Sequence, residues 1–410
     1  MMANAILRLQ RFSCGKGLQV EWMMKKVCVV TGTRAEYGLL RPVMKRLYRD
    51  DTVTMQLVAT GMHLSSEFGM TYREIEEDGF PIHSKIEMLM SSDTQAGITK
   101  SMGVALLGFA DYFAANRPDI VVLLGDRYET FAVAEAAMIA RIPIAHIGGG
   151  EKTEGAMDEA IRHSISKMSH LHFTATEEYR KRVIQLGENP ENVYYVGSLG
   201  IENIRTIQMF AKEEMERLLD FSFSRPTVMV TYHPVTLEYM TSRIQFQNLL
   251  EVLDRHSELS VIFTKANSDT DGRIINKMID DYAAEHTDRC RAYASLGQKR
   301  YLSALQFCCA VMGNSSSGMI EVPSFGIPTV NIGDRQKGRM AADSVITCGN
   351  GVEDIEKALT YAMSDAFKIK CKTVKNPYEK AGTSETIVNR IKEALRKGIS
   401  LKKEFYDIAL

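Results

Sequence analysis

The segment "KKVCVVTGTRAEYGLLRPVMKRL", residues 25–47, combines the features of a buried strand, a glycine turn and a helix. The run from Val27 to Thr31 is mostly β-branched, and Gly32 interrupts it. The apolar residues that follow, from Leu39 to Leu47, recur at helical spacing. A strand, a turn and a helix in this order make the first half of a βαβ unit.

The same alternation recurs along the chain in two series. In the first series we predict further strands at 53–60, 119–124, 142–147 and 171–175, with helices at 103–116 and 130–140. Residues 197–224 interrupt the pattern with a helix rich in Glu and Lys, and "PTVMVTYHPVT" then starts a second series. Its later strands are predicted at 261–265, 291–294, 310–313 and 329–332, and a last helix at 384–397. Strands alternating with helices indicate parallel sheets covered by helices.

The predicted fold class is therefore α/β, with two Rossmann-like doubly wound domains that face each other across a ligand-binding cleft. We expect a poorly structured extension at 1–24, because its charges are scattered and it has no signal-peptide pattern. An N-terminal domain at 25–200 and a C-terminal domain at 201–380 follow. Residues 381–410 are expected to form a helix that packs back towards the N-terminal domain.

Composition excludes several classes of function. The 50 basic and 51 acidic residues give a net charge of -1, so no positive excess is present to attract nucleic acid or an anionic membrane. No apolar run reaches the roughly 18 residues that cross a bilayer. The seven cysteines form no CxxC pair and no spaced set with histidines, so we expect no metal site and the reduced thiols of a cytoplasmic protein.

The segment "VMGNSSSGMIEVPSFGIPTVNIG", residues 311–333, has the strongest signal for a binding site. A buried strand leads through Ser315, Ser316 and Gly318 directly into a helix, so hydroxyls and free N–H groups are positioned to bind a diphosphate. Glu321, one turn further on, is placed to accept both hydroxyls of a ribose. The alternative is an ordinary serine-capped core helix. The pattern is neither GxGxxG with a distant acid nor a P-loop.

Acidic residues follow two neighbouring predicted strands. Asp126 and Arg127 lie in "LLGDRYET", and Glu151 and Asp158 lie in "HIGGGEKTEGAMDEAIRHS", residues 146–164. Carboxylates that converge in a desolvated cleft can divide the roles of base and acid. The alternatives are a helix cap at Asp126 and a solvated i,i+4 ion pair between Asp158 and Arg162. Three glycines in a row predict a sharp turn or a close approach, which we assign to the ligand.

Three further side chains are predicted at strand ends that face the cleft. His233 in "VTYHPVT" has the corresponding position in the second domain, although a histidine before proline is often only structural. Arg34 and Arg339 are placed to neutralise phosphate, or are surface charges.

Together, "TGTRAEYGLL", "LLGDRYE", "GGEKTEGAMDEAIRHSISKMSH", "TYHPVT" and "GNSSSGMIEVPSFGIPTVNIGDRQKGR" resemble the UDP-N-acetylglucosamine 2-epimerases, and most closely their hydrolysing branch in sialic acid synthesis. The resemblance extends from about residue 25 to about residue 397. It implies a GT-B-like fold, no cofactor and no metal. It also implies that the N-terminal domain holds the sugar and the catalytic acids, while the C-terminal domain binds UDP.

The resemblance also assigns roles to residues. Ser315, Ser316 and Glu321 hold diphosphate and ribose, with Arg34 and Arg339 near the phosphates. Asp126, Asp158 and His233 fall on active-site positions. The implied reaction removes the C2 proton and expels UDP to give 2-acetamidoglucal, and water then releases N-acetylmannosamine.

One departure from the family pattern affects these assignments. Gly148 stands where some relatives have a catalytic glutamate, and Glu151 lies three positions on. Either Glu151 takes over that work or the proton transfers differ. The change also fits another substrate, a UDP-linked 2,4-diacetamido-2,4,6-trideoxy sugar of legionaminic acid synthesis.

Three rival functions remain at this point: a non-hydrolysing epimerase, a glycosyltransferase of the same fold and a nucleotide-sugar-binding protein without turnover. "GGGEKTEG" and "MDEAIRHS" differ from the stretches typical of the non-hydrolysing enzymes. The expected partners are a UDP-sugar substrate and further copies of the chain in a dimer or tetramer.

Overall fold

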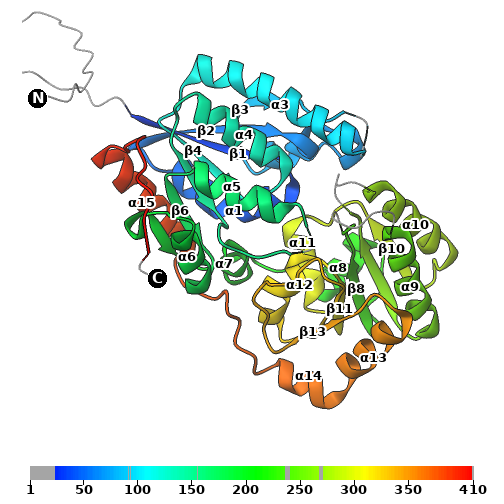
Figure 1. The fold of residues 1–410 in the computed structure, drawn as a ribbon. Helices are drawn as coiled ribbons and strands as arrows, with labels where there is room; N and C mark the ends of the chain where they lie inside the picture. Colours follow the sequence, from blue (N-terminus) through cyan, green and yellow to red (C-terminus); the bar gives the residue numbers. More distant parts are fainter. Residues whose placement is uncertain are drawn as a thin grey trace, which may run out of the picture.

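The computed structural model describes residues 24–90, 92, 94–154, 156–235, 241–266 and 271–408. Apart from Met24, the predicted N-terminal extension therefore lies outside the described residues. The described chain forms two α/β lobes, each built around one parallel sheet with helices on both sides (Figure 1).

The first sheet has seven strands, in the spatial order β3-β2-β1-β4-β5-β6-β7. Their bounds are β1 (Lys25–Thr31), β2 (Val53–Thr60), β3 (Ile82–Ile86), β4 (Ile120–Leu124), β5 (Ile144–Ile147), β6 (Leu171–Thr174) and β7 (Val193–Tyr195). The second sheet has six strands, in the order β10-β9-β8-β11-β12-β13. Their bounds are β8 (Thr227–Thr231), β9 (Ser260–Thr264), β10 (Cys290–Tyr293), β11 (Ala310–Gly313), β12 (Thr329–Ile332) and β13 (Val345–Cys348).

The helices of the first lobe alternate with its strands. They are α1 (Arg34–Tyr48), α2 (Tyr72–Glu77), α3 (Gln95–Asn116), α4 (Tyr128–Ile139), α5 (Asp158–Met168), α6 (Glu177–Gln185) and α7 (Leu199–Thr206). The later helices are α8 (Lys212–Leu219), α9 (Ser242–Arg255), α10 (Gly272–Glu285), α11 (Gly297–Leu305), α12 (Ser316–Ile320), α13 (Val352–Met363), α14 (Asp365–Cys371) and α15 (Thr383–Lys397).

All the strands predicted from apolar runs are present within a few residues of their expected bounds. Three strands were not predicted: β3, β7 and β13. Each lies at an edge of its sheet, where one side of the strand has no neighbour and the burial pattern is partial. Edge strands lack the continuous apolar run of strands that are buried on both faces.

The two sheets repeat one topology. In each, the chain starts in the middle, adds two strands on one side, and then crosses over to add the rest on the other side. The reversal points lie between β1 and β4 and between β8 and β11. In open parallel sheets, ligands bind outside the carboxyl ends of the strands at such a point.

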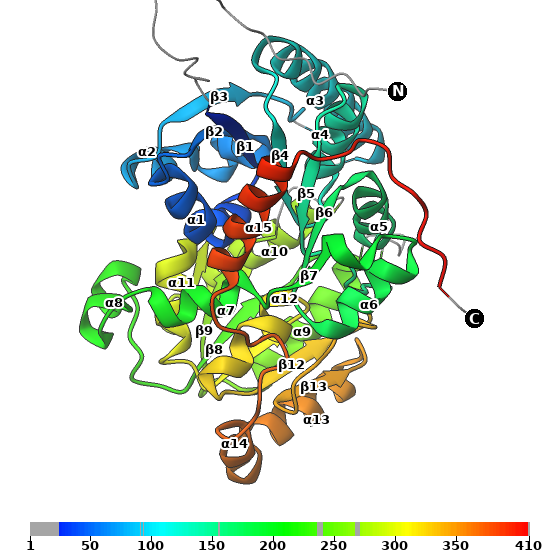
Figure 2. The same ribbon diagram turned by 90° about the vertical axis from the view of Figure 1, so that its left-hand side faces the viewer.

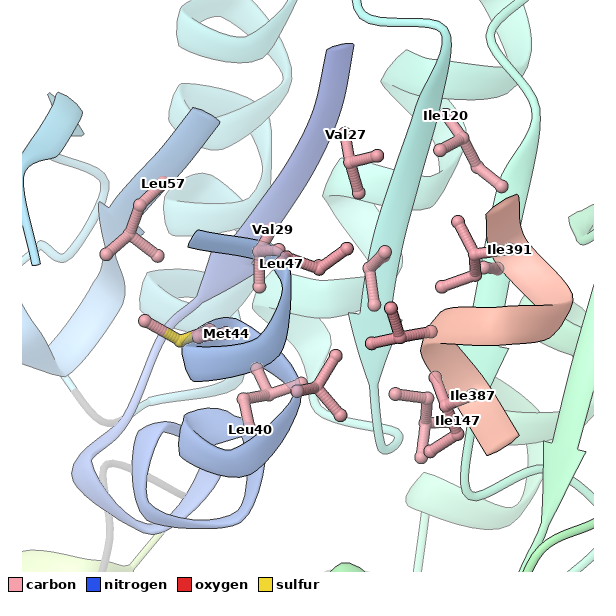
Figure 3. Packing of buried hydrophobic residues seen from close by; sticks show 14 of the residues in the cluster. Val27, Val29, Leu40, Met44, Leu47, Leu57, Ile120, Ile147, Ile387 and Ile391 are labelled. Atoms are coloured by element: carbon pink, nitrogen blue, oxygen red, sulfur yellow. The ribbon is translucent and has the colours of Figure 1, made fainter. Parts of the chain in front are cut away.

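The last helix belongs to the core of the first lobe. After α14, at the bottom of Figure 2, the chain runs back and α15 packs against α1. Figure 3 shows Ile387 and Ile391 of α15 among residues of the first sheet such as Ile120 and Ile147. The chain thus crosses between the lobes twice, which limits how far they can separate.

The packing of α15 predicts the result of a single truncation. Ile391 is 0% exposed, so Ile391→Ala removes buried methyl groups and leaves a cavity. We expect a loss of about 2–5 kcal/mol in the free energy of unfolding, measured by urea denaturation. The matched control is Ile369→Ala on α14, where the side chain is 66% exposed and the expected change is within about 0.5 kcal/mol. Equal, small effects at both positions would show that α15 is not part of the core.

Candidate active site

A cavity of about 300 Å³ lies between the two lobes, against the loops after β1, β8 and β11. The loop after β1 contributes Thr33 and Arg34, and the second lobe contributes His233, Arg335 and the serine turn at 315–317. Glu321 completes this lining, beside Gly200 of α7. The structure therefore brings together five of the predicted site residues: Arg34, His233, Ser315, Ser316 and Glu321.

The serine turn follows β11 directly and begins α12. The Ser315 hydroxyl caps this short helix by accepting the N–H of Ser317 at 3.4 Å. Tyr301 donates its hydroxyl to Ser317 Oγ at 2.8 Å. Gly318 has a different place from the one predicted, because it is buried and a Cβ there would lie 2.8 Å from Thr329 Cγ2. Its missing side chain lets α12 pack on β12.

His233 is fixed through its backbone. Asn314, the first residue after β11, accepts the His233 N–H at 2.7 Å and donates to its carbonyl oxygen at 2.8 Å. The loops after β8 and β11 are thereby joined at the reversal point of the second sheet. His233 and the serine turn both line the cavity.

Two arginines line this cavity. Arg34 pairs with both carboxylate oxygens of Glu74 and donates to the carbonyl of Ser295 at 3.1 Å, which links the two lobes. Arg335 donates to the carbonyl of Asn314 at 3.1 Å. Its buried Nε has no partner among the described residues. We did not predict Arg335, although it lies in the same "GDRQKGR" loop as Arg339.

Glu321 differs from an ordinary surface carboxylate. Its carboxyl group packs against α7, since a Cβ at Gly200 would lie 2.2 Å from Oε1. Burial raises the pKa of Glu321 to about 7, with Glu151 adding to the rise and Ser317 and Arg339 opposing it. In the ionised form each of its two oxygens can accept a hydrogen bond, which suits two adjacent hydroxyls of a ligand.

A second group of charges surrounds Arg162, whose side chain is 1% exposed. Its Nε and Nη2 donate to Asp126 Oδ2, the former at 2.7 Å. Nη1 donates to the carbonyl of Glu151 at 3.0 Å and to Glu159 Oε2 at 2.9 Å. Arg162 therefore organises the ends of β4 and β5 and the start of α5. The solvated ion pair considered from the sequence does not describe this buried arginine.

An ion pair between the lobes completes this group. Arg339 of the second lobe pairs with the Glu151 carboxylate, and the two side chains are 6% and 10% exposed. Beside it, the Glu154 N–H donates to the carbonyl of Lys337 at 3.0 Å. Arg339 Nε and Nη1 are buried without a partner among the described residues. Two donors thus remain available next to Glu151.

The charges around Asp126 decide its ionisation. Burial alone would raise the pKa of Asp126, but Arg162 and Arg339 outweigh it and lower the pKa below its usual value. Asp126 is therefore a carboxylate at neutral pH.

Two further predicted site residues lie nearby in the first lobe. Asp158 lies half-buried in the first turn of α5, and Arg127 donates to Glu129 at 2.6 Å.

This second group lies next to the cavity rather than on its wall. Among the described residues, those lining the cavity do not include Asp126, Arg127, Glu151, Asp158 or Arg339. The charges of Glu151 and Arg339 nevertheless influence the pKa of Glu321. The site is thus a cavity with phosphate-binding character beside a buried cluster of carboxylates and arginines.

The three glycines after β5 serve the packing of the loop. A Cβ at Gly150 would lie 2.2 Å from the Tyr179 carbonyl oxygen, and one at Gly149 would lie 2.9 Å from Ser166 Oγ. Gly148 and Gly150 also have positive φ, which favours glycine. Gly149 and Gly150 therefore let the loop pack closely on α5 and α6, while an approach to a ligand remains a prediction.

Two tyrosines hold the loop that carries Arg339. Met340 N–H donates to the Tyr179 hydroxyl at 3.0 Å, and the Tyr378 hydroxyl donates to the Met340 carbonyl at 2.8 Å. The two hydroxyls lie 2.8 Å apart, so Tyr179 donates to Tyr378 and the ring of hydrogen bonds closes. This fixes the backbone next to Arg339 against the first lobe.

Within the described residues there is no helix long and apolar enough to cross a membrane. The described part of the chain also contains no group of three or more His, Cys, Asp or Glu side chains arranged to hold a metal ion.

Fold and site define the class of protein: an α/β protein of the GT-B-like fold with its site between two Rossmann-like domains. Residues 45–392 match the family model described as UDP-N-acetylglucosamine 2-epimerase. This chain belongs to that family.

Three relatives are similar in sequence to this chain over most of their length. The chain is 42% identical over 344 residues to the GDP/UDP-N,N'-diacetylbacillosamine 2-epimerase (hydrolyzing) of Campylobacter jejuni, covering 84% of this chain and 89% of the relative. It is 40% identical over 386 residues to the polysialic acid biosynthesis protein P7 of Escherichia coli, covering 94% and 98%. It is 36% identical over 370 residues to the UDP-N,N'-diacetylbacillosamine 2-epimerase (hydrolyzing) of Legionella pneumophila, covering 90% and 96%.

Solved structures show the same fold. A co-structure of Staphylococcus aureus MnaA with UDP has a TM-score of 0.76 at 18% identity and covers 94% of this chain and all of that one. The UDP-GlcNAc 2-epimerase of Neisseria meningitidis bound to UDP-GlcNAc has a TM-score of 0.75 at 19% identity, covering 90% and 100%.

The tyrosine ring gives a prediction that does not depend on the reaction. Tyr378→Phe removes two hydrogen bonds and leaves the Met340 carbonyl without its donor. We expect a loss of about 1–3 kcal/mol in the free energy of unfolding, measured by urea denaturation. Tyr361→Phe, at a position 54% exposed on α13, is the control and should change little. Wild-type stability in Tyr378→Phe would mean that the ring does not hold the Arg339 loop.

Proposed function

We propose that this protein is a hydrolysing UDP-sugar 2-epimerase that converts UDP-N-acetylglucosamine and water into N-acetylmannosamine and UDP. The observation that carries the proposal is the juxtaposition in the cleft. A cavity suited to a nucleoside diphosphate lies directly beside a buried, ionised aspartate and a glutamate paired with arginine.

The cavity residues divide the recognition of UDP among them. The hydroxyls and N–H groups of Ser315 and Ser316 contact the diphosphate, with Arg34 and Arg335 neutralising its charge. Glu321 accepts hydrogen bonds from the ribose hydroxyls, and His233 lines the same cavity. The sugar then extends from the diphosphate towards Asp126 and Glu151.

The first chemical step is an elimination. The C1–O bond breaks and its electron pair leaves with UDP, while the C2 proton passes to a carboxylate and a C1=C2 double bond forms. The product is 2-acetamidoglucal. Because no carbonyl acidifies the C2 proton, departure of UDP runs ahead and positive charge develops at C1. Carboxylates stabilise that charge, and the serine turn and arginines stabilise the departing diphosphate.

The second step adds water across the double bond. The water oxygen bonds to C1 while one of its protons passes to a carboxylate, and the electron pair of the double bond takes a proton at C2 on the face opposite to the one that lost it. The product is the free sugar with inverted configuration at C2. Asp126 is ionised in the resting site, so it suits the stabilisation of C1 or the acceptance of the proton. Glu151 and Asp158 are the further acids available for proton transfer, and Arg339 controls the charge next to Glu151.

A second substrate is favoured by a specific observation. The relatives at 42% and 36% identity bear the name of a diacetylbacillosamine 2-epimerase. The same elimination and hydration on UDP-N,N'-diacetylbacillosamine is therefore the second candidate. Both substrates share the UDP group and the 2-acetamido group, and they differ at C4 and C6.

Turnover in deuterated water tests this proposal. We expect incubation with UDP-N-acetylglucosamine to give UDP and free N-acetylmannosamine that carries deuterium at C2, followed by proton NMR. A parallel incubation with UDP-N,N'-diacetylbacillosamine ranks the two substrates by kcat/KM. An equilibrium mixture of UDP-sugars would indicate the non-hydrolysing reaction. Release that requires a sugar acceptor would indicate a glycosyltransferase, and binding of both without turnover would contradict an enzymatic function.

Asp126→Asn separates binding from catalysis. The amide keeps the shape of the side chain but cannot stabilise positive charge or accept a proton as the carboxylate does. We expect kcat to fall by about 10² to 10⁴, with the UDP dissociation constant changed only a few-fold, measured by coupled UDP release and calorimetry. Glu154→Gln, which replaces an exposed carboxylate in the neighbouring loop, is the control and should keep both values. A parallel loss of UDP affinity would place Asp126 in binding instead.

A further inference from the structure

Two buried glutamates lie next to the loops after β1 and β4 in the first lobe, and the proposed reaction uses neither. Glu36 lies in the first turn of α1, and Glu129 lies in the first turn of α4. Glu36 is 7% exposed and Glu129 is 1% exposed. They belong to the two elements that start at the reversal point of the first sheet.

Glu36 holds the loop after β1. Its Oε2 accepts the N–H of Gly32 at 2.8 Å and that of Thr33 at 3.1 Å. In return the Thr33 hydroxyl accepts the Glu36 N–H at 3.3 Å, which makes a capping box. The other oxygen, Oε1, is buried and has no partner among the described residues.

Glu129 holds the loop after β4. Its Oε1 accepts a hydrogen bond from Arg127 Nε at 2.6 Å. Its Oε2 is also buried without a partner in the described part of the chain. Gly32 packs on this side chain, because a Cβ there would lie 2.7 Å from Glu129 Cγ and 3.1 Å from Oε1. The loop that Glu36 binds therefore rests on Glu129.

We propose that Glu36 and Glu129 share one proton, and that this carboxyl pair couples the loop carrying Thr33 and Arg34 to the loop carrying Asp126 and Arg127. A proton on one carboxyl group supplies the donor that the free oxygen of the other lacks. Two ionised carboxylates here would leave two buried charges with one guanidinium, which costs free energy. The effect of this pair on the active site rests on the proposed function. The sharing of the proton between the two glutamates does not depend on that function.

The surrounding charges support a retained proton. Burial raises the pKa of Glu36 to about 8, with Glu129 as the second cause, against Arg127 and the two loop N–H groups. Arg34, the first residue of α1, is paired with Glu74. His63, which contacts Thr31 from the loop after β2, has its pKa lowered to about 4 by burial and is neutral. Arg127 is thus the one cation facing the pair among the charged groups described here.

The consequence is a site that loosens at alkaline pH. Loss of the shared proton above about pH 8 leaves two like charges below Gly32, and their repulsion pushes the two loops apart. The loop after β1 lines the diphosphate cavity, and the loop after β4 carries Asp126. Glu36 and Glu129 act through these loops and are positioning residues.

Glu36→Gln tests the pair through stability. Glutamine offers the same acceptor to the loop and a permanent N–H donor to Glu129, so it mimics the protonated pair at every pH. In the wild type the folded state keeps a proton that the unfolded chain loses near its ordinary pKa. The stabilisation from that proton is complete below about pH 4.5 and disappears as the pH rises to about 8. We therefore expect the wild-type melting temperature to fall relative to Glu36→Gln between pH 5 and pH 9.

Two further variants complete the stability test. Glu129→Gln should remove the same pH dependence, because it removes the other half of the pair. Glu77→Gln, on the exposed face of α2, is the control and should follow the wild type. A wild-type pH dependence in both Glu36→Gln and Glu129→Gln would overturn the proposal. So would failure of both to fold, because glutamine makes the hydrogen bonds of the protonated acid.

A pH profile of kcat/KM tests the coupling to the site. We expect the wild type to lose activity above about pH 8, approaching tenfold per pH unit, and Glu36→Gln to retain it over the same range. Identical alkaline limbs in both proteins would overturn the coupling. If the protein turns over no UDP-sugar at all, the proposed function fails, while the stability measurements still decide whether the proton is shared.

Discussion

The burial of two arginines, Arg162 and Arg339, constrains the whole cleft. A buried guanidinium is tolerated only when carboxylates and carbonyl oxygens surround it, because desolvation costs several kcal/mol per ion. Asp126, Glu151 and Glu159 meet this requirement, and the group joins β4, β5 and α5 of one lobe to a loop of the other. The same contacts leave an ionised aspartate and unused arginine donors beside the cavity. The same buried ion pairs thus hold the cleft together and supply the charges that the proposed reaction uses.

The position of this group follows from the topology. Both sheets reverse their direction of growth once, and the loops at the two reversal points face each other across the cleft. The second lobe supplies the serine turn and His233, which suit a diphosphate. The first lobe supplies Arg34 and the carboxylates. The return of the chain through α15 and the tyrosine ring at Met340 keep these surfaces opposed.

The sequence predicted the parts of this arrangement that depend on local pattern. Runs such as Val27 to Thr31 are buried on both faces of a central strand, so their composition alone identified them. The edge strands β3, β7 and β13 were not predicted, because a strand with one free side needs no continuous apolar run. The fold class followed from the alternation and is confirmed by the structural neighbours.

The site was predicted less completely, for a physical reason. Strand ends and the serine turn marked Asp126, His233 and Ser315 individually, and the structure places the last two in one cavity. The buried role of Arg162 was missed, since the helical pattern of α5 cannot show which tertiary carboxylate an arginine meets. The packing role of Gly149 and Gly150 was also missed, because the spacing of the glycines does not reveal the approach of Ser166 and Tyr179. Long-range packing decided each of these cases.

The location of bound UDP tests the central claim most directly. A crystal structure of the protein with UDP should show the diphosphate against Ser315, Ser316 and Arg335, the ribose at Glu321, and the terminal phosphate directed towards Asp126 and Glu151. Diphosphate density elsewhere on the molecule, with the serine turn unoccupied, would contradict the account.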